Sequence, residues 1–356
     1  MKEFGSDFHK CSEGFVNGRT LNSLLAQPLL YANGRHAIEA LIRQEEWVRI
    51  WIPAYFCNEV IEHIKGTGIN VILYNDYPSS ENDSDVVRSL DFKQGDVLLR
   101  VNYFGLRTFR SNSNIPIPVI EDHSHGIMTD WALRSNADWC IASLRKTLPI
   151  ATGGILWAPT GKKTPIVPPS SNECIDIAIE RWDAMNLKAE YLSTSDSNIK
   201  LQSQAKEEFR QKYINSERRI SDLEVCGIDS ISKNFLDRFD IYLWTEQKAQ
   251  NWSLAIDHLD ERIEILGAKN RYGDGFYPFS LVMLMPSDNE RDRMLQYLIT
   301  QNVYPAVLWR LPESSRFKEA LNFSSRMLSI HCDARYNEAE IIDLCNKINS
   351  YYDASL

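Results

Sequence analysis

The alternation of short apolar segments with amphipathic ones in the first half of the chain is the feature that most constrains its fold. Four apolar runs have the length of β-strands, and they cover residues 48–52, 69–74, 96–102 and 117–120. Residues 34–44 and 58–65 instead carry apolar side chains at the spacing of an amphipathic helix. Strands that alternate with helices predict an α/β fold, with a mostly parallel central sheet and helices on both faces.

The second half of the chain changes character after the proline-rich segment 165–169. Long amphipathic helices are expected over residues 174–192, 198–216 and 235–259. They are followed by a mixed pattern, with strands expected over 277–285 and 327–331 and helices over 290–301 and 338–351. The 356 residues allow one large and one smaller domain.

We therefore expect a large α/β domain over residues 1–230 and a small α+β domain over 231–356. The large domain includes a helical segment, 170–230, which either shapes a substrate pocket or forms a surface between subunits. The pattern alone leaves both roles open.

Composition and charge exclude several classes of protein. The net charge of −9 disfavours a nucleic-acid surface, because neutralising phosphates requires clustered lysine and arginine. The seven cysteines show no CxxC pair and no zinc-site spacing, so no metal is expected and a reducing cytoplasm is favoured. No apolar run reaches the ~20 residues of a membrane span, and no signal peptide is evident at the N-terminus.

Polar side chains gather at the ends of two apolar segments. Residues 118–126 read Pro-Val-Ile-Glu-Asp-His-Ser-His-Gly, and residues 141–147 read Ile-Ala-Ser-Leu-Arg-Lys-Thr. Because ligands of open α/β sheets bind at the carboxyl ends of strands, Asp122 and Lys146 are expected at one site. A carboxylate for a protonated pyridine nitrogen and a lysine that forms a Schiff base are the pair that pyridoxal phosphate (PLP) requires. Alone, Asp122 reads as a helix cap and Lys146 as a solvated surface residue; together they favour the cofactor.

Three residues receive catalytic roles in this hypothesis. Lys146 would bind the cofactor and then transfer the substrate proton as general base and acid. Asp122 would keep the pyridine nitrogen protonated, and His125 would donate to the phenolic oxygen of the cofactor. Arg145, beside the lysine, would lower the pKa of Lys146 or lie at the surface as a neighbour only.

The remaining cofactor contacts are expected from segments further upstream and from the lysine segment. Gly34 and Arg35 open a helix whose free N–H groups suit a phosphate, and Ser143 would add a hydroxyl. The alternative for Ser143 is a solvent-facing serine on a strand. Tyr55 and Phe56 are candidates to stack on the pyridine ring, although aromatic residues after a strand more often belong to a core.

In this order the segments resemble the DegT/StrS family of PLP-dependent aminotransferases. The matching residues are Asn33–Ala37, Ile52–Phe56, Val101–Gly105, Glu121–His125, and Ser143–Lys146 with Gly153-Gly154. The resemblance implies the type I aminotransferase fold, a homodimer with sites at the subunit interface, and action on nucleotide-linked keto-sugars. The chain departs from the family pattern in two places: Arg145 and Thr147 flank the lysine, and Asn102 replaces a histidine. These differences indicate a divergent branch.

The expected activity is transfer of an amino group from glutamate to a keto-sugar in sugar or natural-product biosynthesis. Arg335 is a candidate for the donor carboxylate, with an ion pair as its alternative role. Two other hypotheses remain open from the sequence. One is a PLP enzyme of another reaction type, such as a dehydratase, and the other is a catalytically inert binding protein with the same fold.

Overall fold

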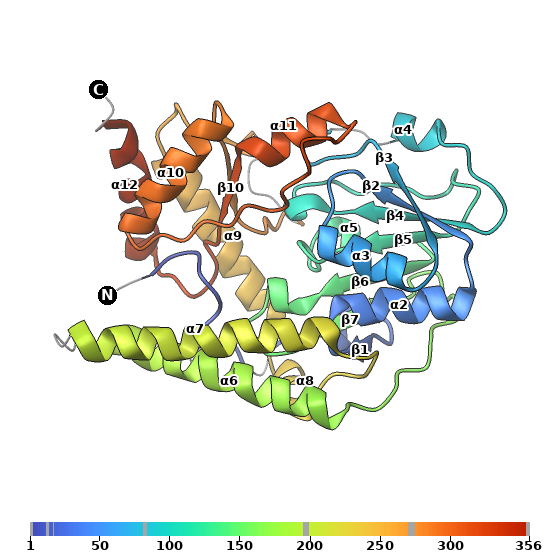
Figure 1. Cartoon of the computed structure of the whole chain (residues 1–356), viewed down its shortest axis with the longest axis horizontal. Coiled ribbons are helices and arrows are strands. Elements are labelled where there is room, and N and C mark those ends of the chain that lie inside the picture. The colour runs from blue at the N-terminus through green and yellow to red at the C-terminus, as the bar shows by residue number, and fades with distance from the viewer. Residues whose placement is uncertain are drawn as a thin grey trace.

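The computed structural model describes residues 3–11, 14–16, 18–80, 84–194, 199–269 and 275–353. Figure 1 shows a large sheet with its helices on one side of the molecule and a smaller α/β part on the other. Two long helices, α6 and α7, run side by side along one edge of both parts (Figure 1). No helix in the described part of the chain is long and apolar enough to cross a bilayer.

The large sheet has seven strands in the order β1-β7-β6-β5-β4-β2-β3. Their bounds are β1 Leu29–Tyr31, β2 Arg49–Pro53, β3 Asn70–Tyr74, β4 Asp96–Val101, β5 Val119–Asp122, β6 Trp139–Ser143 and β7 Gly154–Trp157. Strands β2 to β6 pair in parallel, while β7 is antiparallel to both β6 and β1. The predicted mostly parallel α/β sheet is thus confirmed. Every residue of β4 and β5 is buried, as expected of strands covered on both faces.

Helix α2 (Gly34–Glu45) follows the predicted segment closely. Its apolar residues Ala37, Ile38, Leu41 and Ile42 are all buried against the sheet. Asn33 caps its start, because the Asn33 side chain accepts from the backbone N–H of His36 at 3.0 Å. The helix therefore begins where the sequence predicts, directly after Asn33.

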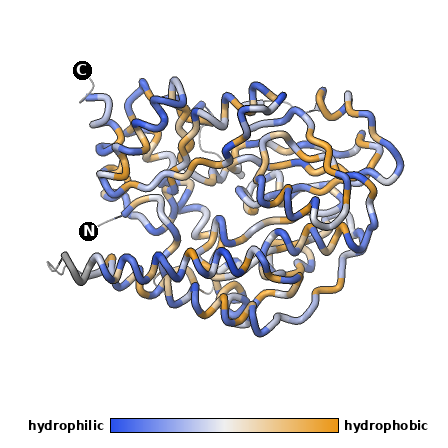
Figure 2. Tube along the Cα trace, in the orientation of Figure 1, coloured by the Kyte–Doolittle hydropathy of each residue, from blue (hydrophilic) through white to orange (hydrophobic). Residues whose placement is uncertain are grey.

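The other elements of this part are short, and all but the first, which precedes β1, lie between strands. They are α1 (Leu21–Leu24), α3 (Asn58–Gly66), α4 (Ser84–Arg88), α5 (Asp130–Leu133) and the 3₁₀ turns η1 (Tyr103–Gly105) and η2 (Leu144–Lys146). Figure 2 shows hydrophobic residues along the central strands and many hydrophilic ones along the outer helices. The sheet thus has its apolar side chains inside, between helices that face solvent.

Helices α6 (Asn172–Ser193) and α7 (Ile199–Asp222) form an antiparallel hairpin. Their contact buries Ala184, Met185, Phe209 and Tyr213. Helix α7 extends beyond the predicted end at residue 216, and its last turn reaches the start of α2. There the side-chain amide of Asn33 donates to the backbone oxygen of Ile220 at 3.3 Å.

The smaller part contains a three-stranded antiparallel sheet in the order β10-β9-β8. Its elements are α8 Ser230–Leu236, α9 Ile241–His258, β8 Glu264–Ile265, β9 Leu281–Leu284, α10 Asp288–Thr300, α11 Lys318–Arg326, β10 Met327–Ile330 and α12 Glu338–Asp353. The helix predicted over 235–259 is confirmed as α9 for most of its length, but its start is later than predicted. Asp240 caps α9, and its side chain accepts from the N–H of Leu243 at 2.9 Å, so residues 237–240 separate α9 from α8. The predicted domain boundary at residue 230 stays a prediction.

Candidate active site

A pocket lies at the carboxyl ends of β5 and β6, where the parallel register places Asp122 opposite Ile141. Its volume is about 110 Å³. Six of the eight residues that the sequence assigns to the cofactor line it together: Gly34, Arg35, Phe56, Asp122, Ser143 and Lys146. The sheet brings them together because neighbouring parallel strands end at one edge. Tyr55 and His125 are not part of the lining.

Lys146 is the last residue of η2, three residues beyond the end of β6. It is partly exposed, and its Nζ lies 5.1 Å from the ring centroid of Trp309. Trp309 comes from the segment between α10 and α11, so the smaller part of the molecule supplies one aromatic wall near the amine. This arrangement places a single amine between the sheet and an aromatic face.

Asp122 ends β5 and is 8% exposed. Its Oδ1 accepts from the backbone N–H of Ser124 at 2.8 Å, which fixes the orientation of the carboxylate. Its Oδ2 has no hydrogen-bond partner among the described residues. The carboxylate therefore keeps an acceptor for a ligand in the pocket, in addition to its local role in the turn.

The start of α2 forms a narrow cradle against the sheet. A Cβ on Gly34 would lie 3.2 Å from the Cβ of Ser143, and a Cβ on Gly154 would lie 2.0 Å from the backbone oxygen of Asn33. Both glycines thus allow a close approach that a side chain would obstruct. Ser124 closes the cradle, since its hydroxyl accepts from the N–H of Ser143 at 2.8 Å. A helix N-terminus with hydroxyls beside it is suited to a phosphate.

The pocket is also lined by charged residues to which the sequence pattern gave no role there. Glu217 of α7 pairs with Arg145, and its Oε2 also accepts from Arg181 Nη1 at 3.0 Å. Burial alone would raise the pKa of Glu217, but the charges of Arg145 and Arg181 lower it to about 2. Glu217 lies 72 residues from Arg145 on an amphipathic helix, and no motif marks it.

His125 lies beside the pocket, in an aromatic stack. Its ring is 4.3 Å from that of Phe279 and 5.4 Å from that of Trp309, with the planes nearly parallel. Nδ1 accepts from the backbone N–H of Phe104 at 3.2 Å, so the proton of the neutral ring resides on Nε2. Burial is the main cause that holds the pKa of His125 well below its ordinary value, and the charge of Lys146 is the second cause. His125 is therefore a neutral donor through Nε2.

Tyr55 is part of the core and not of the pocket, which corrects the expectation that it faces a cofactor ring. It is completely buried, with its ring edge-on to those of Tyr103 and Phe323. The chain bends at residues 54–56, directly after β2, and of these two neighbours only Phe56 lines the pocket. Of the two candidate aromatics, Phe56 alone is placed to contact a ligand.

Two polar clusters outside the pocket are satisfied by the chain itself. Arg335 does not line the pocket, because its guanidinium binds Asp333 through Nε at 2.8 Å and Nη2 at 2.9 Å. Glu121, His123 and Cys140 offer ligand atoms within 4.8 Å of one another. However, both Glu121 oxygens already have partners: Asn112 at 2.7 Å, Ser135 at 2.6 Å and His123 at 3.1 Å. This cluster is a buried hydrogen-bond network around Glu121 of β5.

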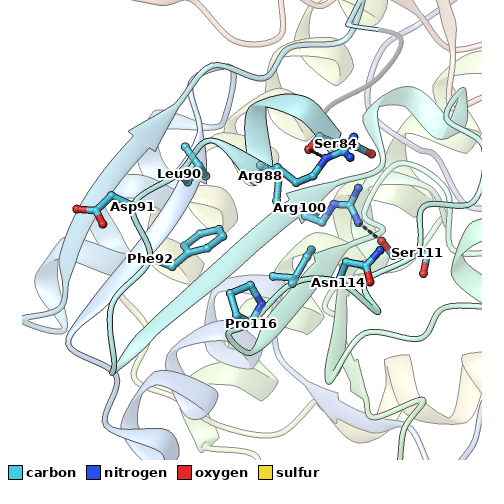
Figure 3. A pocket seen from close by; sticks show the side chains of 11 residues that line it. Ser84, Arg88, Leu90, Asp91, Phe92, Arg100, Ser111, Asn114 and Pro116 are labelled. Atoms are coloured by element: carbon cyan, nitrogen blue, oxygen red, sulfur yellow. Dashed lines mark hydrogen bonds between the residues drawn. The ribbon is translucent and has the colours of Figure 1, made fainter.

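A larger cavity of about 570 Å³ lies elsewhere, beside α4 and β4. Figure 3 shows Arg88 and Arg100 above Phe92 and Pro116 in this cavity. The Arg100 guanidinium donates to the backbone oxygen of Ser111 at 3.3 Å and to the side chain of Asn112 at 2.7 Å. Among the described residues, its lining contains no lysine and a single carboxylate, that of Asp91. The smaller pocket is thus the candidate active site, because it combines an amine, a carboxylate and a phosphate cradle.

Solved structures with the same fold include several aminotransferases. The model superposes on Spr1654 of Streptococcus pneumoniae, described as a sugar aminotransferase and solved in its PMP form, with a TM-score of 0.63 and 14% identity over 100% of both chains. Helicobacter pylori PseC, an aminotransferase of pseudoaminic acid biosynthesis, gives 0.62 and 11% identity over 99% of this chain and 100% of PseC.

A DegT DnrJ EryC1 StrS aminotransferase of Brucella abortus gives a TM-score of 0.57 and 12% identity over 95% of this chain and 91% of that one. The chain has the fold of these aminotransferases. No protein-family model matches the sequence, and no curated protein matches it either. The structural match therefore extends the resemblance seen in the sequence to the whole length of the chain.

Proposed function

We propose that this chain is a PLP-dependent aminotransferase. The observation that carries the proposal is the joint lining of one pocket by the Asp122 carboxylate, the Lys146 amine and the start of α2. Each of these features is common alone. Together in one pocket, they provide the pyridinium partner, the Schiff-base amine and the phosphate site that PLP requires. The match to an aminotransferase that has been solved in both PLP and PMP forms supports the same cofactor.

The chain's own residues fit the cofactor in the following way. Asp122 Oδ2 is available to hold the proton of a pyridine nitrogen, and Phe56 lines the pocket as a ring contact. The neutral His125 is able to donate through Nε2 to the phenolic oxygen. Gly34, Arg35 and Ser143, which line the pocket, would hold the phosphate. When bound, PLP supplies the electron sink that stabilises a carbanion at the amino carbon.

Lys146 is the residue that moves the proton. It is partly exposed and lines the pocket, with Nζ 5.1 Å from the ring centroid of Trp309. With the cofactor bound, Lys146 would take the proton from the donor carbon as general base and return it as general acid. The Trp309 ring would shield one side of the amine from solvent.

For the substrates, we propose glutamate as the amino donor and a keto-sugar, nucleotide-linked, as the acceptor. Two matched proteins support this class: DesI, solved in the presence of its TDP-sugar product, and PseC. We also propose a cytoplasmic homodimer, with the two sites near the subunit interface. Light scattering of the purified protein tests the dimer, since a monomeric mass at micromolar concentration contradicts it.

The decisive experiment is the absorption spectrum of the protein with PLP, before and after glutamate, compared with Lys146→Ala. We expect a lysine-dependent band in the visible range that bleaches as the donor transfers its amine. Lys65→Ala, which removes an exposed lysine paired with Glu62, serves as the control and should behave as wild type. A band that forms but does not respond to glutamate favours the inert binding protein, and no lysine-dependent band refutes the cofactor.

A further inference from the structure

Three nearly buried arginines lie around Glu217 beside the pocket, and two of them, Arg35 and Arg145, line it. The side chains of Arg35, Arg145 and Arg181 are 12%, 10% and 11% exposed. They come from α2, η2 and α6, so three elements direct positive charge to one place. Buried guanidinium groups require negative partners, because desolvation of an unbalanced charge is costly.

The carboxylates that pair with these arginines are shared, exposed or distant. Arg145 and Arg181 share the single carboxylate of Glu217. The nearest acid to Arg35 is Glu59, at 4.0 Å and 78% exposed, and Arg181 reaches Asp7 only at 3.5 Å. An anion in the pocket would therefore give Arg35 and Arg145, which line it, a further negative partner besides these carboxylates.

Arg145 has a donor without a partner. Its Nε is buried and makes no hydrogen bond among the described residues, although Nη2 of the same guanidinium binds Glu217. Arg145 lines the pocket together with Gly34 and Ser143, the two residues of the phosphate cradle. A guanidinium that lines the cradle and keeps one donor without a partner is suited to phosphate oxygens.

Helix α7 places Glu217 at this point. Two hydrogen bonds join the last turn of α7 to the start of α2. The Asn33 side-chain amide donates to the backbone oxygen of Ile220 at 3.3 Å, and Arg35 Nη2 donates to Ser221 Oγ at 3.1 Å. Glu217 lies one turn earlier, against Arg145. The hairpin thus fixes its carboxylate relative to the cradle.

We propose that Arg145 binds the phosphate group of the cofactor and that Glu217 positions its guanidinium for that contact. The inference rests on the proposed function, since it assigns a residue to the phosphate of PLP. It gives the α6–α7 hairpin a role in building the cofactor site from outside the sheet. An anion from the substrate has the same chemistry as the cofactor phosphate, and the experiment separates the two.

The test compares the affinity of PLP with that of pyridoxal, which lacks the phosphate, in Arg145→Gln and Glu217→Gln. We expect Arg145→Gln to weaken PLP binding by about 10- to 100-fold and to change pyridoxal binding by less than about 2-fold. Glu217→Gln should weaken PLP by about 3- to 10-fold, because it leaves the guanidinium in place but unoriented. Binding is followed by titration of the absorption band or of tryptophan fluorescence.

Matched controls come from the same helix. Arg218→Gln and Glu208→Gln change the charge of α7 by the same amounts at exposed positions and should leave both affinities unchanged. Arg145→Lys, which keeps the charge but not the fork, should recover only part of the PLP affinity. Circular dichroism melts confirm that each variant is folded. If Arg145→Gln does not fold, Glu217→Gln, at a half-exposed position, still tests the proposal.

Three outcomes overturn the inference. If wild type binds PLP and Arg145→Gln binds it equally well, Arg145 serves another anion, such as one on the substrate. If PLP and pyridoxal weaken alike, Arg145 has a structural role only. If wild type binds no PLP, the proposed function fails and the inference fails with it. The first two results leave the proposed function intact.

Discussion

Two arginine–carboxylate pairs in this molecule show how the same interaction serves different ends. Arg335 and Asp333 are each 1% exposed, and the pair lies within the smaller part. Arg145 is 10% exposed, but its partner Glu217 is half exposed. The first pair is sealed from solvent on both sides, whereas the second has one buried and one accessible member.

The difference extends to the donors of each guanidinium. Arg335 uses Nε and Nη2 on Asp333 and Nη1 on the backbone oxygens of Ser6 and Asp7, at 3.2 and 3.0 Å. Arg145 leaves Nε without a partner beside a pocket. A saturated arginine is thus structural, and an unsaturated one next to a cavity is available for a ligand.

The largest expected effect is on the saturated pair. Asp333→Asn leaves the Arg335 charge buried without its carboxylate, and we expect a loss of about 3–5 kcal/mol in the free energy of unfolding. Urea denaturation at neutral pH measures this loss. The affinity for PLP should change by less than about 3-fold, because the pair lies outside the pocket. A loss below about 1 kcal/mol would show that the pair is not structural.

The next effect concerns Lys248, a second cation near Asp333. Its side chain is 4% exposed, and it makes no ion pair or hydrogen bond among the described residues, since Arg335 occupies both Asp333 oxygens. Burial lowers the pKa of Lys248 from 10.5 to about 8, against the opposing charge of Asp333. His125 and His331 also lie within range of its charge.

We expect Lys248→Met to be more stable than wild type by up to about 3 kcal/mol at pH 7. The folded pKa of Lys248 lies below the unfolded one, so between about pH 8 and pH 10.5 the unfolded state binds more protons. Wild-type stability should therefore rise relative to the variant across this window. Denaturation of both proteins from pH 7 to 10 measures the gap, and a gap that widens with pH contradicts the argument.

The smallest expected effect is on the accessible pair. Glu217→Gln should lower the free energy of unfolding by about 1–2 kcal/mol, because two nearly buried arginines lose the carboxylate they share, although water reaches that carboxylate and screens the pairs. The same variant is expected to lose PLP affinity, so its stability and its PLP binding are measured separately. A loss of stability above about 2 kcal/mol would place Glu217 with Asp333 as a structural residue.

The sequence predicted the pocket residues that directly follow strands. It did not predict those that tertiary contacts bring to the pocket. Asp122 and Lys146 were predicted because polar residues directly after apolar strands have few structural explanations when they occur together. Glu217 was missed because it lies on a charged helix face, where acids are common. Trp309 lies in a connecting segment, and no periodicity places it over Lys146.

The same distinction applies to the fold. The central strands were predicted from their apolar runs, but β1 has only three residues and takes its place by pairing with β7, far along the chain. Helix α11, residues 318–326, was missed because its apolar positions are few. Tyr55 and Phe56 are adjacent in sequence, and only the direction of the backbone at the end of β2 decides which one faces the pocket.

The first residues described in the structure connect distant parts of the molecule. Gly5 donates its backbone N–H to the Tyr336 hydroxyl across 331 residues of sequence, Phe4 bridges to Val303, and Ser6 accepts from Lys188. Contacts of such sequence separation carry the greatest cost of loop closure. During synthesis Phe4 and Gly5 thus lack their partners Val303 and Tyr336 until residues beyond 300 have left the ribosome, so these contacts form among the last, after the central sheet.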